Sequence, residues 1–392
     1  MKANPLWFAV RLGALLTLLL ILGACGGSSI IGCRFDCAQK VTQAEVLYVG
    51  SAGQIQIFPI NTDSGALGSP TIISGLNTAG SGTATPSGKF LYVSDSKNNQ
   101  IDGYNIDSST GALTPMAGSP FPRGAVANSA SGLGIDPGGK FLYATDFNGF
   151  NVLAFTINSS DGGLAAVPGS PFGSGFYPAV AVVDPTTQFL NVADVGIGSL
   201  GGISSYTIDS NGALTAGASG ALVLLLNTGV ADIAMHRTGK FLYASTGILP
   251  SDSGVMLISV DQNSGALTQV GSTPFPTGLA PEKITMHPQG MFLYTANIGD
   301  GTISGFRIDN ASGMLTPVSG SPFPIFTVPP PGGLIFFDVA IDSSGQFLYA
   351  DDPLTSNILG FRIDSLTGSL TALGQTPRSG QGLAGFTIVG LP

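Results

Sequence analysis

The sequence is built from one unit that recurs seven times. Its most regular part is the triplet Phe-Leu-Tyr or a close variant, with central leucines 44 to 55 residues apart at Leu47, Leu91, Leu142, Leu190, Leu242, Leu293 and Leu348. A Gly-x-Leu turn also occurs seven times, at Gly65, Gly111, Gly162, Gly212, Gly265, Gly313 and Gly368. Such a repeat constrains the fold strongly, because each copy must bury its apolar face against its neighbours.

Each unit contains four short apolar segments, which we name strands A to D from the inside outward. Between the two markers, strand C carries paired apolar residues two positions apart, such as Phe58 and Ile60, which places both on one face of a strand. Glycine (57 residues) and proline (26 residues) are abundant and only 9% of residues are charged, a composition that favours short strands and tight turns. The sequence therefore predicts an all-β fold, a seven-bladed β-propeller of four-stranded antiparallel blades.

The two ends of the repeat region complement each other. The first unit starts directly at its strand B, residues 45–50, whereas the chain ends in an extra apolar run at residues 383–389. We expect this last segment to complete the first blade as its inner strand, which closes the ring and protects the sheet edges. The propeller is then expected to span residues 44–392.

The N-terminal segment has the pattern of a bacterial lipoprotein signal. Lys2 and Arg11 precede an apolar stretch at residues 13–22, and Leu22-Gly23-Ala24-Cys25 matches a lipobox. An uncleaved membrane helix is the weaker alternative, because the apolar run is shorter than the roughly 20 residues that span a bilayer. We expect a signal peptide at residues 1–24, lipidation at Cys25 and a location in the cell envelope, in the outer membrane or facing the periplasm.

The segment after the signal peptide, residues 25–43, reads as a flexible tether. It contains Cys33 and Cys37, which are expected to form a small disulfide loop in an oxidising compartment. Two cysteines at this spacing without a nearby histidine make a poor zinc site, so no metal and no cofactor is expected. The net charge of −9 argues against nucleic acid as a partner and leaves a small molecule or an envelope protein.

The repeats resemble those of a known family. The Phe-Leu-Tyr unit, the strand C pattern and the Gly-Ala-Leu-Thr turn are similar to the YVTN-type repeats of the β-propeller lactonases, which include 6-phosphogluconolactonases. The resemblance covers residues 44–392 and implies a propeller and a lactone-opening site. In catalytic members the segment before one inner strand reads Pro-Arg-His. That strand ends in His-Pro-x-Gly, and the next loop carries Asn-Glu.

The chemical positions of that pattern differ here. Pro281, His287-Pro288 and Asn297 match the family, but Glu282 stands for arginine, Lys283 for histidine, Ile298 for glutamate and Ala231 for a further histidine. A lactonase needs a group that activates water and a donor for the oxyanion. We therefore expect no catalytic residues and a ligand- or protein-binding module, with Glu282 and Lys283 as candidate ligand-binding residues or simply as a solvated ion pair. The alternative is a lactonase with a rebuilt site.

A second group of candidate ligand residues follows strand B in each repeat. A polar rim that holds sugar hydroxyls or calcium is one interpretation, and a set of hydrogen-bonded turns is the favoured one. His236 and His287 are expected to be turn residues between strands A and B. The strand B positions are Asp95, Asp146, Asp194, Asn297 and Asp352, with Ser51 and Thr246 in the other two repeats.

Overall fold

A computed structural model describes residues 44–51, 53–74, 82–124, 132–196, 201–216, 223–224, 229–246, 253–325, 338–379 and 384–392. They belong to one compact unit, Gln43–Pro392. The expected signal peptide (residues 1–24) and tether (residues 25–43), with the three cysteines Cys25, Cys33 and Cys37, lie outside the described residues. Within the described ranges, no helix is long and apolar enough to cross a membrane.

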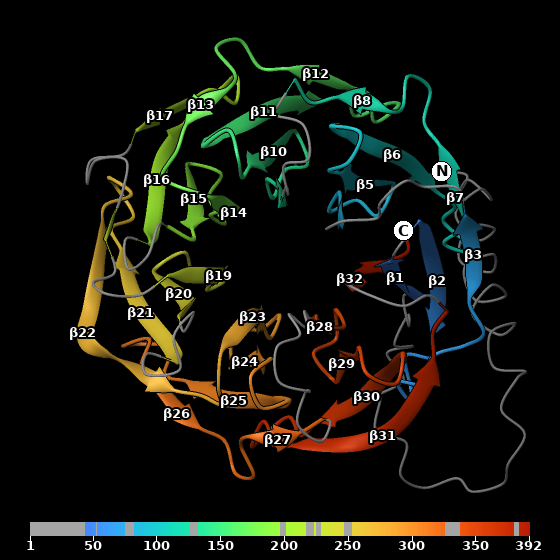
Figure 1. The fold of residues 1–392 in the computed structure, drawn as a ribbon, viewed down its shortest axis with the longest axis vertical. Helices are drawn as coiled ribbons and strands as arrows, with labels where there is room; N and C mark the ends of the chain where they lie inside the picture. Colours follow the sequence, from blue (N-terminus) through green and yellow to red (C-terminus); the bar gives the residue numbers. More distant parts are fainter. Residues whose placement is uncertain are drawn as a thin grey trace, which may run out of the picture. The chain divides into compact units, whose positions relative to one another are not determined.

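Seven antiparallel sheets stand around a ring, as the sequence predicts (Figure 1). The A strands line the centre: β32 (Ala384–Gly390), β4 (Gly82–Ala84), β9 (Leu133–Ile135), β14 (Pro178–Val183), β19 (Val230–Met235), β23 (Pro281–Met286) and β28 (Val339–Ile341). The B strands carry the Phe-Leu-Tyr triplets: β1 (Glu45–Ser51), β5 (Phe90–Asp95), β10 (Phe141–Asp146), β15 (Phe189–Asp194), β20 (Phe241–Thr246), β24 (Phe292–Asn297) and β29 (Phe347–Asp352).

The outer half of each blade consists of strands C and D. The C strands are β2 (Gln54–Ile60), β6 (Gln100–Ile106), β11 (Asn151–Ile157), β16 (Gly202–Ile208), β21 (Gly254–Val260), β25 (Thr302–Ile308) and β30 (Asn357–Ile363). The D strands are β3 (Thr71–Ser74), β7 (Leu113–Pro115), β12 (Leu164–Ala166), β17 (Leu214–Ala216), β22 (Leu267–Pro276), β26 (Leu315–Pro317) and β31 (Leu370–Pro377). Four blades add a short outer piece: β8 (Phe121–Pro122), β13 (Phe172–Gly173), β18 (Val223–Leu224) and β27 (Phe323–Pro324).

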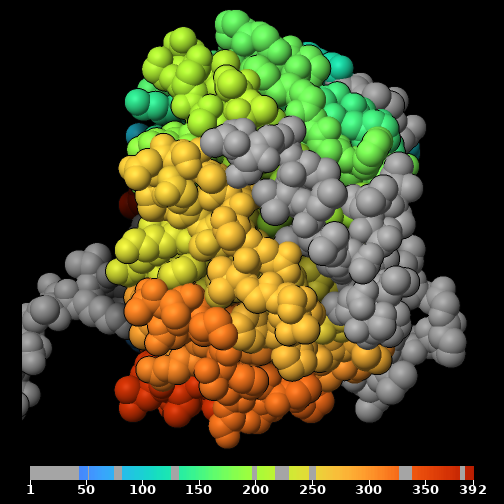
Figure 2. Space-filling view, turned by 90° about the vertical axis from the view of Figure 1, so that its left-hand side faces the viewer, coloured from blue at the N-terminus to red at the C-terminus, as the bar shows by residue number. Residues whose placement is uncertain are grey.

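The last strand of the chain completes the first blade, which confirms the predicted closure. Strand β32 pairs antiparallel with β1 along its whole length, from Glu45 opposite Gly390 to Ser51 opposite Ala384. Each inner strand also contacts the inner strand of the next blade, including β28 with β32. The ring is therefore continuous, and Figure 2 shows neighbouring blades, coloured yellow to orange, side by side along its rim.

The Phe-Leu-Tyr triplet fastens each blade to the next. Six tyrosine hydroxyls donate to the carbonyl oxygen of the glycine that begins the neighbouring Gly-x-Leu turn. These pairs are Tyr48 to Gly111, Tyr92 to Gly162, Tyr143 to Gly212, Tyr243 to Gly313, Tyr294 to Gly368 and Tyr349 to Gly65, at 2.6–3.1 Å. Because the same bond forms between the last blade and the first, closure reproduces the packing found elsewhere in the ring.

One blade replaces this tyrosine with Asn191. Its side chain is fully buried, and neither its amide nitrogen nor its amide oxygen has a hydrogen-bond partner among the described residues. Ser205, opposite Asn191 in strand β16, donates instead to the Gly265 carbonyl of the next blade at 3.3 Å. This seam therefore has a weaker and less complete hydrogen-bond set than the other six.

Candidate functional site

Three consecutive inner strands begin with the same irregularity. The pairing of β14, β19 and β23 with their B strands shifts by one residue, so that Ala179, Ala231 and Glu282 are each an extra residue in a bulge. These bulges lie at the end of the ring formed by the B-to-C turns and the D-to-A loops, which we call the B–C face. Bulges re-aim neighbouring side chains, and they are common beside active sites.

The bulge residue Glu282 and its neighbour Lys283 lie beside an aspartate of the preceding blade. The Lys283 Nζ atom is 3.8 Å from Oδ2 of Asp232, with side chains 35% and 9% exposed respectively. The expected ion pair between Glu282 and Lys283 is therefore wrong, because the lysine pairs with Asp232. Ring packing places β19 against β23, and this brings Asp232 to the lysine.

Asp232 is fixed by backbone donors from two blades. Its carboxylate accepts the N–H groups of Ile233 at 2.8 Å and Ile284 at 3.2 Å. Asp338, directly before β28, is held in the same way, because its carboxylate accepts the N–H groups of Val339 at 2.8 Å and Phe386 at 2.9 Å. Both carboxylates thus bridge a blade to the next one and keep a fixed position on the B–C face.

Glu282 is the group best placed for proton transfer. Burial raises its pKa to about 8, Lys283 opposes this effect, and Asp232 and Asp338 add to it. Its buried Oε2 atom has no hydrogen-bond partner among the described residues. The negative charge of Asp232 raises the pKa of Lys283, so that the lysine stays cationic. The cluster therefore joins a carboxyl group that can exchange protons near neutral pH with a fixed cation.

Three of the predicted rim residues bond within their own B-to-C turns, whereas Asp194 and Asn297 bond side chains of strand C or of the loop before strand A. Asp95 accepts the N–H of Asn98, Asp146 that of Gly149 and Asp352 that of Leu354, while Asp194 accepts the hydroxyls of Ser174 and Ser204, and Asn297 donates to Thr302 and Ser304. All five are buried. Of the other two positions, Thr246 donates to the Gly254 carbonyl, and Ser51 is buried at the end of β1. The contacts of Asp95, Asp146 and Asp352 fit the turn interpretation, whereas the Ser51 hydroxyl has no hydrogen-bond partner among the described residues.

The two histidines of the propeller lie at the opposite end of the ring. Nε2 of His236 is 3.1 Å from the Gly290 carbonyl oxygen, and Nε2 of His287 is 3.1 Å from that of Gly345. Both rings are buried in turns between strands A and B. They fasten neighbouring blades and stand apart from the Glu282 cluster.

A buried ion pair on the B–C face was missed by the sequence reasoning. Arg378 follows β31 and binds Asp351 through Nε at 2.6 Å and Nη2 at 3.0 Å, with both side chains fully buried. The next residue, Ser379, donates its N–H to Gln56 at 2.8 Å. These contacts fix the chain just before the closing strand. No spacing in the sequence signals them, because Asp351 in β29 and Arg378 after β31 meet only when the last blade folds, and Ser379 meets Gln56 of the first blade only when the ring closes.

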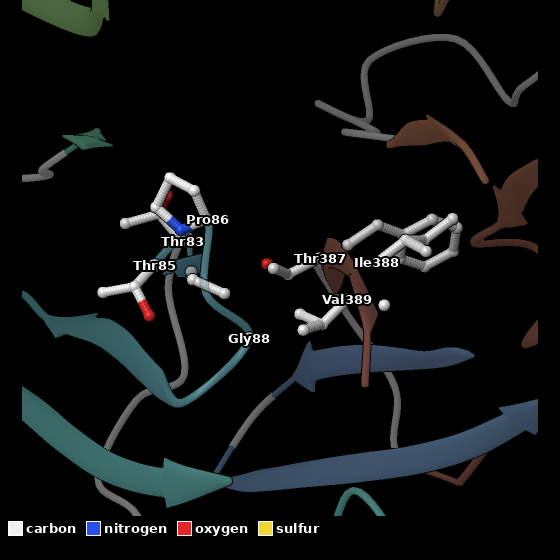
Figure 3. Close-up of a pocket in the computed structure, with 11 residues that line it drawn as sticks. Thr83, Thr85, Pro86, Gly88, Thr387, Ile388 and Val389 are labelled. Carbon is white, nitrogen blue, oxygen red and sulfur yellow. The ribbon is translucent and has the colours of Figure 1, made fainter. Parts of the chain in front are cut away.

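A separate cavity of about 310 Å³ lies between the inner strands β4 and β32. Figure 3 shows Thr83, Thr85 and Pro86 on one side of it and Thr387 and Val389 on the other. None of its lining residues carries a titratable side chain. The cavity can therefore accept a polar ligand but offers no group for acid–base catalysis.

Comparison with known proteins agrees with the repeat pattern and the ring. A family model described as lactonase, 7-bladed beta-propeller, matches residues 51–175 and 222–324, which is more than half of the chain. The chain belongs to this lactonase family. The resemblance of its repeats to the β-propeller lactonases is thereby confirmed.

Two curated relatives of this lactonase-family chain are named 6-phosphogluconolactonase. The protein from Yersinia enterocolitica is 24% identical over 85% of this chain and 95% of its own length, and that from Xenorhabdus nematophila is 25% identical over the same shares. Among solved structures, the periplasmic gluconolactonase PpgL of Pseudomonas aeruginosa matches with a TM-score of 0.72 and 18% identity, over 89% of this chain and 100% of that one. At this identity the structural match shows the fold alone.

Proposed function

We propose that this chain is a lactonase that opens sugar lactones with Glu282 as its general base. Membership of the lactonase family and the names of its relatives support lactone hydrolysis. The observation that carries the proposal is the Glu282 carboxyl group, which has a pKa of about 8 and a buried Oε2 without a partner among the described residues. Such a carboxyl group is tuned for proton transfer near neutral pH.

In the proposed reaction, ionised Glu282 removes a proton from a water molecule as the water oxygen bonds to the lactone carbonyl carbon. The carbonyl oxygen becomes negative, and the ammonium group of Lys283 stabilises this charge. Asp232 keeps the lysine cationic and in place. When the ring C–O bond breaks, protonated Glu282 returns its proton to the leaving ring oxygen. The product is the open-chain hydroxy acid.

This assignment explains how the site can work without the family's usual residues. The positions of arginine and histidine are occupied by Glu282 and Lys283, so that a proton acceptor and a cation are both present with their order exchanged. Ile298, at the family's glutamate position, cannot transfer protons. The reaction would therefore depend on the bulge in β23, which presents both side chains at the start of the strand.

The test is lactone hydrolysis by the purified propeller and two variants. Glu282→Gln should lower kcat by about 10²- to 10⁴-fold, the usual contribution of a general base. Lys283→Met should lower kcat by about 10²- to 10³-fold, as expected for loss of an oxyanion donor. Asp309→Asn, an exposed turn residue at the opposite end of the ring, serves as the matched control. Wild-type kcat in Glu282→Gln would contradict the proposal.

A second candidate function is binding without catalysis. The cavity between β4 and β32 favours it, because this cavity is lined by threonine hydroxyls and backbone groups and has no titratable side chain. A thermal-shift screen of sugars and sugar acids tests it, since a bound ligand raises Tm whether or not it reacts. Thr387→Val should abolish a shift that arises from this cavity and leave lactone hydrolysis unchanged.

The location of the protein is part of the proposal. The lipobox ending at Cys25 supports export and attachment to the cell envelope through an N-terminal lipid. Palmitate labelling of the full chain tests this, with Cys25→Ser as the variant that should lose both the label and the membrane fraction. An unlabelled wild-type protein recovered without the membrane would contradict the anchor.

A further inference from the structure

The positive charges of the propeller are distributed unequally between its two ends. All lysines and arginines after residue 43 lie among the described residues, so their places are known. Arg307 and Arg362 donate to carbonyl oxygens of C-to-D turns, at the end opposite the B–C face. The A-to-B turns at that same end hold a further set, namely Lys89, Lys140, Arg237 and Lys240.

The cations of the B–C face are already engaged by carboxylates, with one exception. Arg378 is fully buried against Asp351, and Lys283 lies beside Asp232. Arg123 is 3% exposed. Burial lowers the pKa of its guanidinium group, and the negative charges of Asp146 and Asp95 oppose this effect. The exception is Lys97, which is exposed in the B-to-C turn of the second blade.

Carboxylates dominate the same face. Asp232 and Asp338 stand on either side of Glu282 along the ring, each fixed by two backbone N–H groups. Asp300 lies in the turn after β24 of the same blade and accepts the N–H of Leu279 at 2.9 Å. A phosphate group carries a charge of about −1.5 to −2 near neutral pH and is normally bound by unpaired arginine or lysine. The carboxylates around Glu282 would instead repel a phosphate group.

We propose that this site hydrolyses uncharged sugar lactones and discriminates against lactones that carry a phosphate group. The inference rests on the proposed lactonase function and deepens it by naming the substrate class. It separates this chain from the activity for which its 6-phosphogluconolactonase relatives are named. The physical basis is like-charge repulsion by the carboxylates around Glu282, where the nearest cation, Lys283, already lies beside Asp232.

The direct test compares D-glucono-1,5-lactone with its 6-phosphorylated form on the same preparation. We expect kcat/KM to be at least about tenfold higher for the uncharged lactone. Raising the ionic strength from about 0.01 to 0.15 M shortens the Debye length from about 30 to 8 Å. This change should increase kcat/KM for the phosphorylated lactone and leave that of the uncharged lactone nearly constant.

A pair of added cations provides the matched control. Ala231 occupies the bulge of the blade beside Glu282, and Ala179 occupies the same bulge one blade further away. Ala231→Arg should raise the kcat/KM ratio of phosphorylated to uncharged lactone, and Ala179→Arg should raise it less. A wild-type preference for the phosphorylated lactone, weakened by salt, would overturn the inference while the lactonase function stands. Failure of the folded protein to hydrolyse either lactone would overturn both.

Discussion

Tyr349 donates its hydroxyl hydrogen to the carbonyl oxygen of Gly65 at 2.9 Å, across the seam between the last blade and the first. The two residues are 284 positions apart in the sequence, yet the bond is the same one that joins five other neighbouring pairs of blades. The closing seam therefore depends on the same interaction as the internal seams, in addition to the strand pairing of β1 with β32.

Removing this hydroxyl should weaken the closed ring measurably. Tyr349→Phe keeps the aromatic ring and leaves the buried Gly65 carbonyl without its donor, which costs about 1–3 kcal/mol of the free energy of unfolding. Urea unfolding measures the loss. Tyr177→Phe is the control, because the Tyr177 ring packs against Phe147 and Phe150 but its hydroxyl makes no hydrogen bond to the described residues. Equal stability of the two variants would contradict the role of the seam bond.

Substitution at the seam that contains Asn191 should increase the stability of the protein. In three blades the Phe-Leu-Tyr tyrosine stands opposite a glycine, whereas Asn191 stands opposite Ser205. The double variant Asn191→Tyr/Ser205→Gly should restore the hydroxyl-to-carbonyl bond with Gly265 and stabilise the protein by about 1 kcal/mol.

The single variant Ser205→Gly provides the comparison. It removes the one side-chain donor to Gly265 that the structure shows and adds nothing, so its Tm should fall below that of the wild type. A double variant that melts no higher than Ser205→Gly alone would show that a tyrosine does not fit this seam.

The buried pair of Asp351 and Arg378 should be costly to break. Burial raises the pKa of Asp351 to about 6, and Arg378 opposes this effect. Arg378→Met leaves the carboxylate buried without its cation and should lower the free energy of unfolding by about 3–5 kcal/mol. Asp351→Leu/Arg378→Met removes both charges and should recover part of that loss in urea unfolding. A double variant less stable than Arg378→Met would argue that the pair acts through more than its charges.

Glu282 should make stability fall as pH rises. Its pKa is near the model-peptide value of 4.5 when the chain is unfolded and about 8 in the folded protein. Between these values the unfolded chain has released the proton that the folded chain still holds, so each increase in pH favours unfolding. Glu282→Gln removes this contribution, and its Tm should decline less than that of the wild type between pH 5 and pH 8. Parallel pH profiles of Tm would contradict the burial of this carboxyl group.

Much of the fold follows from patterns that are local in the sequence. The triplet at Phe292-Leu293-Tyr294 and the turn at Gly313 recur with the period of a blade, so their number gives the number of blades. The missing strand A before Glu45 and the extra run near residue 388 predict closure, because strands with apolar faces and unpaired edges must find partners.

The site was predicted less well, for a physical reason. Alignment with the family pointed to Glu282 and Lys283, but it did not reveal that Asp232 is the partner of the lysine or that Asp338 stands on the next blade. Those contacts connect residues about fifty positions apart. The repeat pattern does not show which acidic side chain will lie beside which cation once the strands are packed in the ring.

The sequence by itself determined the repeat, the four strands of each unit and the way the chain ends meet, because these depend on hydrophobic periodicity and turn residues that each unit carries within itself. Only the tertiary structure decided the chemistry of the B–C face. A pKa depends on burial and on nearby charges, so the pKa of Glu282 rises to about 8 only once the ring buries its carboxyl group and adds the negative charges of Asp232 and Asp338 from the two neighbouring blades, against the opposing charge of Lys283.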